Sequence, residues 1–415
     1  MFSDKTVSNK ISDILRNRSR NRSHFAQPFP KKEKDDVFRK SRGGCLYIKV
    51  NIRSERKVFA NFALLVLTKV KTIMSKYITI KDIANELGIS KSTVSRALSG
   101  DSSNVKVETM QLITETARRM GYHRNEMAVS LRKQSSHNIG IIIPEIVTSF
   151  YMTFISHAQT ILRKHGYNVL IATSNENCAQ ERENMEMMEH CMVDGLLISV
   201  CDKERNADVY RRIVSRGIPV VFFDRTVEDV EASQVRLDDY IMSFFMVEQL
   251  IRSGSRNIVH IPGPSHIRNG YERLRGYRDA LEKFHIPYDP ALVLSPALSA
   301  EDGSRVMSDF IDRGIPFDTV FGFTETSLIG AKNLIQKRGL RIPEDVRVCC
   351  MSGTALCTLV HPTITAVEQP VEQMAVEACR LLMQNITSSD KSVEDVVLRG
   401  EIVERESTSI LTNFV

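Results

Sequence analysis

The sequence predicts a small all-α headpiece followed by an α/β body of two doubly wound parallel sheets. Two short helical patterns joined by a glycine turn lie between residues 79 and 98. Beyond residue 138, apolar runs alternate with helical patterns, as in repeated β-α units. The chain has 415 residues, too many for one ordinary domain, and its 42% hydrophobic and 26% charged residues are typical of globular proteins. Two or three domains are therefore expected.

The first helical pattern begins near residue 80. Thr79 can cap this helix, and Asp82 stands three residues later as its capping-box partner. The apolar residues Ile83, Ala84 and Leu87 fall on one helical face. Gly88 supplies the left-handed residue that ends the helix. A short amphipathic helix followed by a tight turn is therefore predicted.

The second helical pattern follows Ser90, a residue type that caps helices. Val94 and Leu98 should face the core, so short polar and basic side chains point outwards. These are Lys91, Ser92, Ser95 and Arg96. Such side chains suit contacts in a DNA groove. An ordinary helical hairpin would fit the Ala and Gly residues equally well but would not explain the polar start, so the pair is interpreted as a helix-turn-helix that reads DNA.

A third helix completes the headpiece. Met110, Ile113, Ala117 and Met120 form one stripe, and Gly121 stands at its exit. The segment 125–133 that follows is short, can turn helical, and precedes the polar stretch 134–138. It is predicted to be a hinge between domains.

The body contains two sets of strand and helix signals. The first set is 139–143, 152–164, 168–172, 180–191, 195–200 and 219–223. The second set is 257–261, 274–283, 291–294, 319–323, 326–337 and 346–351. Each set predicts a parallel sheet with helices on both faces. Because ligands of such sheets bind beyond the carboxyl ends of the strands, the crevice between the two lobes is the expected pocket.

Charge is unevenly distributed along the chain. Residues 1–73 carry 18 Lys and Arg against 6 Asp and Glu, a net +12, and residues 74–135 carry 10 against 6, a net +4. Since the whole chain is +6, residues from 136 onward are −10. A basic headpiece on an acidic body is expected if only one end meets DNA phosphates.

The basic segment 1–73 has two interpretations. It can be a disordered arm that adds nonspecific DNA affinity. We favour the other, that translation begins at Met74 and these residues are never made; mass spectrometry of the native N-terminus distinguishes the two.

Sequence motifs do not indicate an enzyme, a cofactor or a metal site. There is no P-loop, no dinucleotide-binding glycine motif, no zinc-protease motif and no nucleophile elbow. The eight cysteines form no C-x-x-C pair, and His260, His266 and His361 lack spaced partners, so these residues are expected to be structural or at the surface. No apolar run approaches the roughly 18 residues that a membrane helix needs. A cytoplasmic protein without a membrane partner is expected.

The chain resembles the lactose-repressor family of bacterial transcription regulators from about residue 78 to residue 407. The motifs that carry the resemblance are TIKDIA at 79–84, SKSTVSR at 90–96, GY at 121–122, the hinge, and IGIIIP at 139–144. It implies a two-lobed core like that of periplasmic sugar-binding proteins, with the chain crossing between lobes near Leu237, Val367 and Lys391. Predicted boundaries are 74–124 for the headpiece, 125–136 for the hinge and 137–415 for the core. The N-lobe is then about 137–237 and 367–390, and the C-lobe about 238–366 and 391–415.

The resemblance also implies how DNA is bound. Lys91, Ser92 and Arg96 are expected to touch base edges in the major groove. Mainly phosphate contacts are expected from Ser90, Thr93, Ser95 and Asn104. Leu131, helped by Ala128, is expected to pry open a central base step from the minor groove. The sequence departs from the pattern at Arg124, where proline is usual, and at Val129, where arginine is usual.

Effector residues are implied in the same way. Phe150 and Tyr151 would stack on a sugar face, although core aromatics would give the same pattern. Asp224 and Arg225 would hydrogen-bond ligand hydroxyls or brace the pocket, with a plain surface ion pair as the alternative. Arg273 would point into the cleft.

The pocket pattern is broken at three residues in two motifs. Thr324 and Glu325 replace the usual Asn-Asp, and Ser352 replaces a pocket aspartate. A cleft that loses a carboxylate and keeps Arg225 and Arg273 suggests an anionic ligand, such as a sugar acid or sugar phosphate.

The sequence thus predicts a DNA-binding transcriptional regulator, with repression favoured over activation. It would bind a pseudo-palindromic double-stranded operator as a homodimer and respond to a sugar or sugar derivative. A stand-alone solute-binding protein would explain the body but not the headpiece. A catabolite-type regulator, whose co-effector is another protein, stays open.

Overall fold

The computed structural model describes residues 78–99, 105–123, 135–388 and 393–409. The segment 1–73, the hinge residues 125–134, and the predicted DNA contacts Asn104, Ala128 and Leu131 lie outside these ranges. The chain divides into two compact units, Met1–His123 and Arg124–Val415. Each unit is described by itself.

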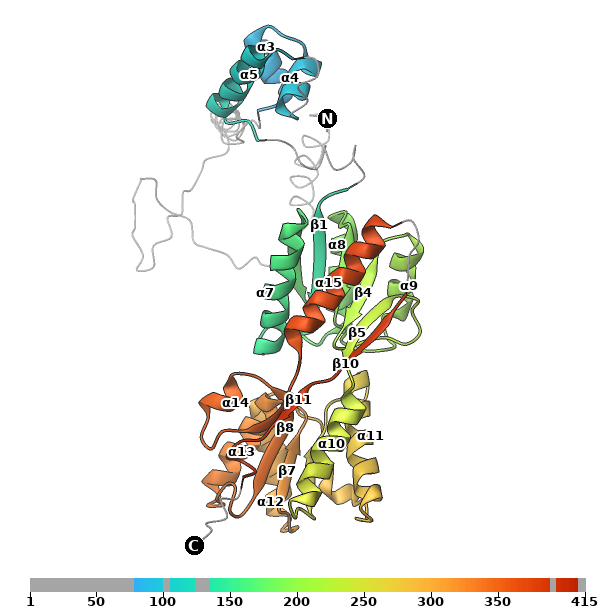
Figure 1. The fold of residues 1–415 in the computed structure, drawn as a ribbon, viewed down its shortest axis with the longest axis vertical. Coiled ribbons are helices and arrows are strands. Elements are labelled where there is room, and N and C mark those ends of the chain that lie inside the picture. Colours follow the sequence, from blue (N-terminus) through green and yellow to red (C-terminus); the bar gives the residue numbers. More distant parts are fainter. Residues whose placement is uncertain (1–77, 100–104, 124–134, 389–392, 410–415) are drawn as a thin grey trace, which may run out of the picture. The chain divides into compact units, whose positions relative to one another are not determined.

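The first unit contains the three predicted headpiece helices, α3 (Ile80–Leu87), α4 (Lys91–Leu98) and α5 (Val107–Met120), labelled in Figure 1. The predicted capping box is confirmed: the Asp82 N–H donates to Thr79 Oγ1 at 3.4 Å, and the Thr79 N–H donates to Asp82 Oδ2 at 2.9 Å. The glycine that ends α3 has a φ of 65°, and the one that ends α5 has a φ of 70°. Left-handed backbone of this kind favours glycine because it has no Cβ.

The headpiece core lies where the three helices meet. Ile83 of α3, Val94 of α4 and Ile113 of α5 are completely buried and belong to one cluster. Ala84 and Ala97 are buried beside them, and their small side chains allow close approach of the helices. Burial of these apolar faces fixes the outward face of α4.

The N-lobe of the body is built on a six-stranded sheet in which all neighbouring strands pair in parallel. Its order is β10-β5-β4-β3-β1-β2. The strands are β1 (Asn138–Ile143), β2 (Asn168–Thr173), β3 (Gly195–Ile198), β4 (Val220–Phe223), β5 (Ser233–Leu237) and β10 (Asp395–Leu398). The central strands β3 and β4 are buried along their whole length, as expected of strands covered on both faces.

Four helices cover this sheet. Ile139, Ile141 and Ile143 of β1 pack with α7 (Ser149–Lys164) and α15 (Val371–Thr387), which lie side by side over the strands in Figure 1. Ile142 points the other way, into a cluster with α8 (Cys178–His190) and α9 (Ala207–Ser215). The alternation follows from the two-residue period of a strand.

The C-lobe repeats this arrangement on a five-stranded sheet of order β11-β9-β8-β7-β6. Its strands are β6 (Ile258–Ile261), β7 (Thr319–Gly322), β8 (Arg347–Gly353), β9 (Thr365–Glu368) and β11 (Glu401–Val403). One core cluster contains residues of α12 (Ala300–Asp312) and α13 (Glu325–Lys337), and another contains residues of α10 (Asp239–Arg252) and α11 (Arg268–Lys283). A short helix, α14 (Leu356–Leu359), follows β8. The predicted pair of doubly wound sheets is confirmed, with β11 as an antiparallel edge strand.

Two expectations about the body were wrong. The predicted strand 291–294 is largely a 3-10 turn, Pro290–Leu292, since Pro290 fixes its own φ and lacks an N–H donor; only Val293 bridges to His260. The third lobe crossing also lies later than Lys391. β10 pairs with β5 of the N-lobe, so the chain crosses between Leu398 and Glu401.

The position of that crossing escaped sequence reasoning because β10 is a short edge strand. Asp395 and Val397 are exposed and only Leu398 is buried, so no continuous apolar run marks the strand. Residues 393–398 therefore belong to the N-lobe, and the predicted C-lobe segment 391–415 begins too early.

Candidate functional site

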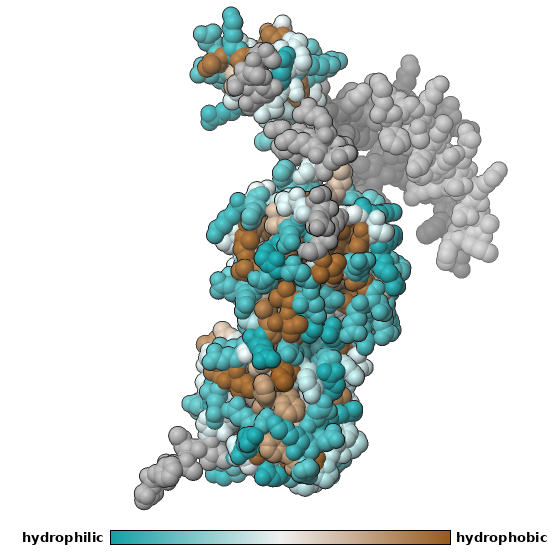
Figure 2. Space-filling model, turned by 45° about the vertical axis from the view of Figure 1, so that its right-hand side comes forward, coloured by the Kyte–Doolittle hydropathy of each residue, from teal (hydrophilic) through white to brown (hydrophobic). Residues whose placement is uncertain are grey.

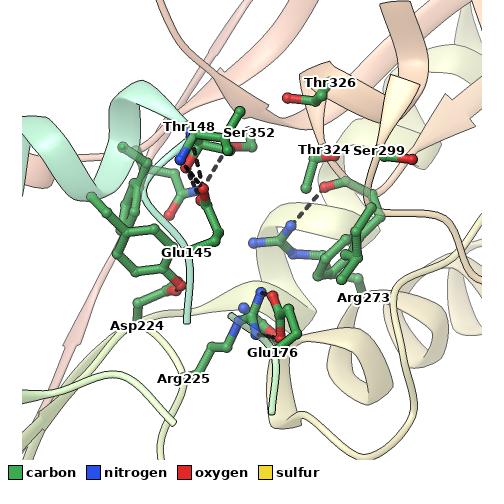
Figure 3. A pocket seen from close by; sticks show the side chains of 17 residues that line it. Glu145, Thr148, Glu176, Asp224, Arg225, Arg273, Ser299, Thr324, Thr326 and Ser352 are labelled. Carbon is green, nitrogen blue, oxygen red and sulfur yellow. Dashed lines mark hydrogen bonds and ion pairs between the residues drawn. The ribbon is translucent and has the colours of Figure 1, made fainter. Parts of the chain in front are cut away.

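A cavity of about 240 Å³ lies between the two lobes, at the carboxyl ends of their strands. All seven predicted effector residues line it: Phe150, Tyr151, Asp224, Arg225, Arg273, Thr324 and Ser352. The other lining residues are Glu145, Val147, Thr148, Glu176, Asn269, Leu298, Ser299, Phe323, Thr326 and Gln369. Figure 3 shows Asp224 and Arg225 on one side of the cavity and Arg273 and Thr324 on the other. The topology therefore joins predicted residues up to 202 positions apart in the sequence, Phe150 and Ser352, into one site.

Two adjacent aromatic side chains at the start of α7 form the N-lobe wall. Phe150 and Tyr151 meet edge to face, with ring centroids 5.1 Å apart. The Tyr151 hydroxyl donates to Asp224 Oδ2 at 2.7 Å and lies 3.1 Å from Ser199 Oγ. Burial raises the pKa of Tyr151 well above its usual value, so the phenol stays protonated. The wall thus combines apolar ring surface with a fixed polar group.

Asp224 directly follows β4 and has left-handed backbone, with a φ of 57°. Asp and Asn tolerate this conformation better than most residues, which accounts for an aspartate at this turn. Its carboxyl group is buried, and burial raises its pKa while the neighbouring Arg225 opposes the rise. Strained non-glycine backbone is typical of ligand sites.

Arg225 pairs with a residue that the sequence did not reveal. Its Nη1 and Nη2 atoms donate to Glu176 at 2.8 and 2.9 Å, a bidentate arrangement. Glu176 also has left-handed backbone, with a φ of 56°. Because the Arg225 side chain is only 7% exposed, the alternative of a plain surface ion pair was wrong.

Arg273 enters the cavity from α11 and is almost completely buried. Its Nε donates to Asp239 Oδ1 at 2.7 Å, and its Nη1 donates to the Phe323 carbonyl at 2.7 Å. The guanidinium carbon lies 4.4 Å from the centre of the Phe323 ring. In Figure 3 the remaining terminal nitrogen points into the cavity. Arg273 is therefore held on three sides and presents one donor to a ligand.

Two of the three residues that break the family pattern, Thr324 and Ser352, form the C-lobe end of the site. Thr324 caps α13, and its Oγ1 accepts the Ser327 N–H at 3.3 Å. Ser352 is buried and accepts a hydrogen bond from Gln369 Nε2 at 3.4 Å. Behind them, Glu325 accepts from Thr354 Oγ1 at 3.2 Å, and burial raises the pKa of this carboxyl group. Small hydroxyl groups thus replace the usual amide and carboxylate.

Two further lining residues carry buried oxygen atoms that accept no hydrogen bond from the described residues. These are Asn269 Oδ1 and Gln369 Oε1. A buried acceptor without a donor costs free energy, so a ligand hydroxyl at either atom would be stabilised. Their signal in the sequence was weak, although Asn269 lies where α11 begins after β6, a position that the strand-end rule favours.

The charges of the site do not support the expected anionic ligand. Both arginines are already paired with carboxylates, Arg225 with Glu176 and Arg273 with Asp239. Glu145, Glu176 and Asp224 line the cavity against only these two arginines. An added anion would therefore meet an excess of negative charge rather than free cations.

The headpiece presents the predicted DNA-reading side chains on α4. Lys91 and Ser92 are exposed, whereas Thr93, Ser95 and Arg96 are partly buried. Ser90 Oγ accepts the Thr93 N–H at 3.1 Å and so caps the helix. The Arg96 Nε folds back onto the Ser92 carbonyl at 3.3 Å, a weak exposed contact that a base could replace. The outward side chains stand on a rigid helix whose other face is buried.

Other kinds of site are not indicated. In the described ranges, no three His, Cys, Asp or Glu side chains come together as a metal site would need. His260 is buried between the Tyr277 and Phe321 rings, and burial lowers its pKa to about 4. No helix of the described ranges has the length and apolar character to cross a membrane.

Two family models match this chain. Residues 136–407 match the model described as periplasmic binding proteins and sugar binding domain of the LacI family. Residues 79–125 match the model described as bacterial regulatory proteins of the lacI family. The residues between the two matches, 126–135, fall within the segment predicted to be the hinge.

Individual proteins give the same assignment. The chain is 27% identical over 331 residues to the HTH-type transcriptional regulator RegA of Clostridium saccharobutylicum, covering 80% of this chain and 99% of the relative. A solved complex of the transcriptional regulator CelR with cellobiose is similar at 26% identity and a TM-score of 0.61, covering 80% of this chain and 99% of that one. The lac repressor dimer bound to operator and the anti-inducer ONPF shares the fold, with a TM-score of 0.70, 19% identity, and coverage of 80% and 99%.

Proposed function

Because the chain belongs to the lacI family of bacterial regulatory proteins, we propose that it is a transcriptional repressor whose operator affinity depends on a small carbohydrate effector. The observation that carries this proposal is the convergence of all seven predicted effector residues on one cavity between the lobes. The same chain has a helix-turn-helix headpiece, which a stand-alone solute-binding protein would not need. We assign it no enzymatic activity and place it in the cytoplasm, where the operator is.

The α4 helix supports a role in reading base edges. The solvent-facing part of α4, away from the buried Val94 and Ala97, carries Lys91, Ser92 and Arg96. Ser90, Thr93 and Ser95 lie beside them and would contact phosphates, which position the helix but carry no sequence information. Asn104, Ala128 and Leu131 complete the proposed DNA contacts.

The cavity supports a neutral sugar as the effector. Phe150 and Tyr151 offer ring surface for the apolar face of a sugar, and carboxylate and amide oxygens accept hydrogen bonds from its hydroxyl groups. At about 240 Å³ the cavity is small, close to the lower end of the range for ligand pockets, which favours a molecule of monosaccharide size.

A homodimer is proposed because two-fold symmetry matches a pseudo-palindromic operator. The solved lac repressor complex, which shares this fold, is a dimer on its operator. Figure 2 shows apolar residues at the surface of both lobes. Exposed apolar side chains of Met152 on α7, Val376 on α15 and Leu359 on α14 are candidates for the subunit contact.

The proposed mechanism is linkage between the two ligands. The effector contacts both lobes, so it stabilises one relative placement of them, and that placement determines how the two hinge segments of a dimer are spaced. If the effector favours a spacing that does not match the operator, operator affinity falls, and by reciprocity operator binding weakens effector binding.

The proposal is tested by selecting bound duplexes from a random DNA library with the full-length protein. The selected duplex is then challenged with a panel of neutral sugars, sugar acids and sugar phosphates. Recovery of a pseudo-palindromic sequence and its release by a neutral sugar are expected. Failure to select any sequence would overturn the proposal, and release by a sugar phosphate alone would overturn the neutral effector.

Asp224→Asn should weaken binding of that sugar about tenfold, or about 1.4 kcal/mol, because a charged acceptor becomes a neutral one. Asparagine tolerates left-handed backbone, and its amide oxygen can still accept from Tyr151, so the fold should be kept. Isothermal titration of the sugar gives the affinity.

The matched control is Asp312→Asn, which removes an exposed carboxylate of the C-lobe that pairs with Arg338. This control should bind the sugar as the wild type does. Equal affinities of Asp224→Asn and the wild type would show that Asp224 braces the wall and does not touch the ligand.

A further inference from the structure

A single carboxylate holds the segment that leads into the body. Asp194 Oδ2 accepts hydrogen bonds from Ser135 Oγ at 2.5 Å and from the His137 N–H at 3.1 Å. Asp194 Oδ1 accepts from the Ser136 N–H at 2.7 Å and from Ser136 Oγ at 3.1 Å. One side chain therefore makes four hydrogen bonds to three consecutive residues, the last two predicted hinge positions and the residue after them.

Further contacts hold the same three residues. The His137 carbonyl accepts the Asn168 N–H at 2.8 Å, and the His137 ring lies 5.6 Å from the Tyr167 ring. Ser136 Oγ accepts the Asn138 N–H at 3.1 Å. His137 has left-handed backbone, with a φ of 52°, which a non-glycine residue adopts only when its surroundings impose it. Several independent contacts thus hold residues 135–137 in one conformation against the N-lobe.

The C-lobe contains an equivalent aspartate, but the segment that it holds is not part of a hinge. Asp318 precedes β7 as Asp194 precedes β3, and its Oδ2 accepts the Arg256 and Asn257 N–H groups at 2.8 and 2.7 Å. In each lobe the aspartate N–H also donates to a carbonyl at the start of the neighbouring strand, that of Asn138 in β1 or that of Asn257 just before β6. A carboxylate at this position is therefore part of the lobe architecture, and only the N-lobe copy adds the two serine hydroxyls of the hinge.

We infer that Asp194 is a positioning residue that fixes the exit direction of the hinge and thereby sets which operator spacing the dimer accepts. The inference rests on the proposed function, since it needs a dimer that reads two half-sites. If the start of the hinge is held in one orientation, the two headpieces of a dimer can bind half-sites at one separation. If that restraint is lost, the headpieces can bind half-sites at several separations. Four hydrogen bonds to a charged acceptor are enough to restrain three residues.

Strands β1 and β3 connect Asp194 and the residues that it holds to the effector cavity. β1 and β3 begin beside Asp194 and end at Ile143 and Ile198. Shortly after these ends come Glu145, which lines the cavity, and Ser199, which contacts Tyr151. Six residues of β1 span about 20 Å at the rise of a strand. A shift of β1 and β3 at their cavity end would therefore also move residues 135–137 at the other end of the strands.

The test measures spacing selectivity with the full-length protein. The duplex selected by the wild type is compared with duplexes that carry one base pair more or one fewer at the centre. The wild type should prefer the selected spacing by roughly tenfold or more, and Asp194→Ala should reduce that preference to roughly threefold or less. Nonspecific affinity and its salt dependence should not change, because no phosphate contact is altered.

Two controls separate positioning from a loss of folding. Asp318→Ala removes the equivalent carboxylate of the C-lobe and should lower stability while keeping the wild-type spacing preference. Should Asp194→Ala fail to fold, Ser135→Ala/Ser136→Ala, which removes only the hinge hydroxyls, takes its place.

The outcomes distinguish this inference from the function on which it rests. A wild type that selects no duplex contradicts the proposed function. A wild type with a clear spacing preference that Asp194→Ala or the double serine variant retains in full overturns the positioning role.

Discussion

Arg273→Met is expected to destabilise the body by about 3–5 kcal/mol at neutral pH, the largest effect of any substitution proposed for this chain. The methionine keeps the apolar stem but removes the guanidinium, which leaves Asp239 buried without its cation. It also leaves the Phe323 carbonyl without the donor that reaches it at 2.7 Å. Urea denaturation of the variant and the wild type gives the difference.

The acid dependence of this loss identifies its cause. Burial already raises the pKa of Asp239, and Arg273 opposes the rise. Without Arg273 the folded pKa should rise further above the unfolded one. A carboxyl group whose folded pKa is raised above its unfolded pKa contributes stability at pH values below the unfolded pKa. That contribution is lost as the pH rises through the folded pKa. The gap between variant and wild type should therefore shrink as the pH is lowered.

The matched double variant Arg273→Met/Asp239→Asn removes both charges. It should recover most of the lost stability, since the penalty comes from one unpaired buried charge and not from the missing pair. If the single variant lost less than about 1 kcal/mol, Asp239 would not depend on Arg273 for its burial. If the double variant recovered nothing, packing at Phe323 would be the cause.

The headpiece was predictable in detail because its signals are local. The caps and turn at Thr79, Asp82, Gly88 and Ser90 each depend on a hydrogen bond to a residue no more than four positions away. Such caps and turns are read directly from a sequence because their partners are neighbours. The two sheets were predictable for a similar reason, since each strand shows its own apolar run.

The convergence of the effector residues was predictable from topology together with the family resemblance. Tyr151, Asp224 and Thr324 follow or flank the carboxyl ends of different strands, which parallel sheets bring to one edge. What this rule could not give was the partner of each charge. Glu176 and Asp239 lie 49 and 34 residues from the arginines that they hold.

That missing information changed the expected ligand. From the sequence, Arg225 and Arg273 looked like two free cations beside a lost carboxylate at Ser352. The structure pairs both arginines with carboxylates, Arg225 with the exposed Glu176 and Arg273 with the buried Asp239, and the ligand that we propose is therefore a neutral polyol. Counting charges in a motif is unreliable wherever burial forces ions into pairs.

Arg96→Ala should cost about 1–3 kcal/mol of specific DNA binding, which is roughly a factor of 5 to 150 in affinity, and should relax the base preference at one position of each half-site. The α4 helix keeps its Ser90 cap and its buried Val94 and Ala97, so the headpiece should fold as before. Among the described residues, the Arg96 side chain donates to the Ser92 carbonyl at 3.3 Å, a weak contact whose loss should cost little stability.

Competition binding of the selected duplex and single-base variants gives the affinity and the preference together. Arg119→Ala is the matched control, because Arg119 is an exposed arginine of α5 that pairs with Glu86 of α3 at 3.1 Å and is not among the predicted contacts. It should leave base preference unchanged.

A base-reading arginine and a phosphate-binding one differ in one respect: loss of the first weakens the cognate sequence selectively, whereas loss of the second weakens every sequence alike. Uniform weakening by Arg96→Ala would therefore assign Arg96 to the phosphates and leave Lys91 and Ser92 as the proposed readers of the operator.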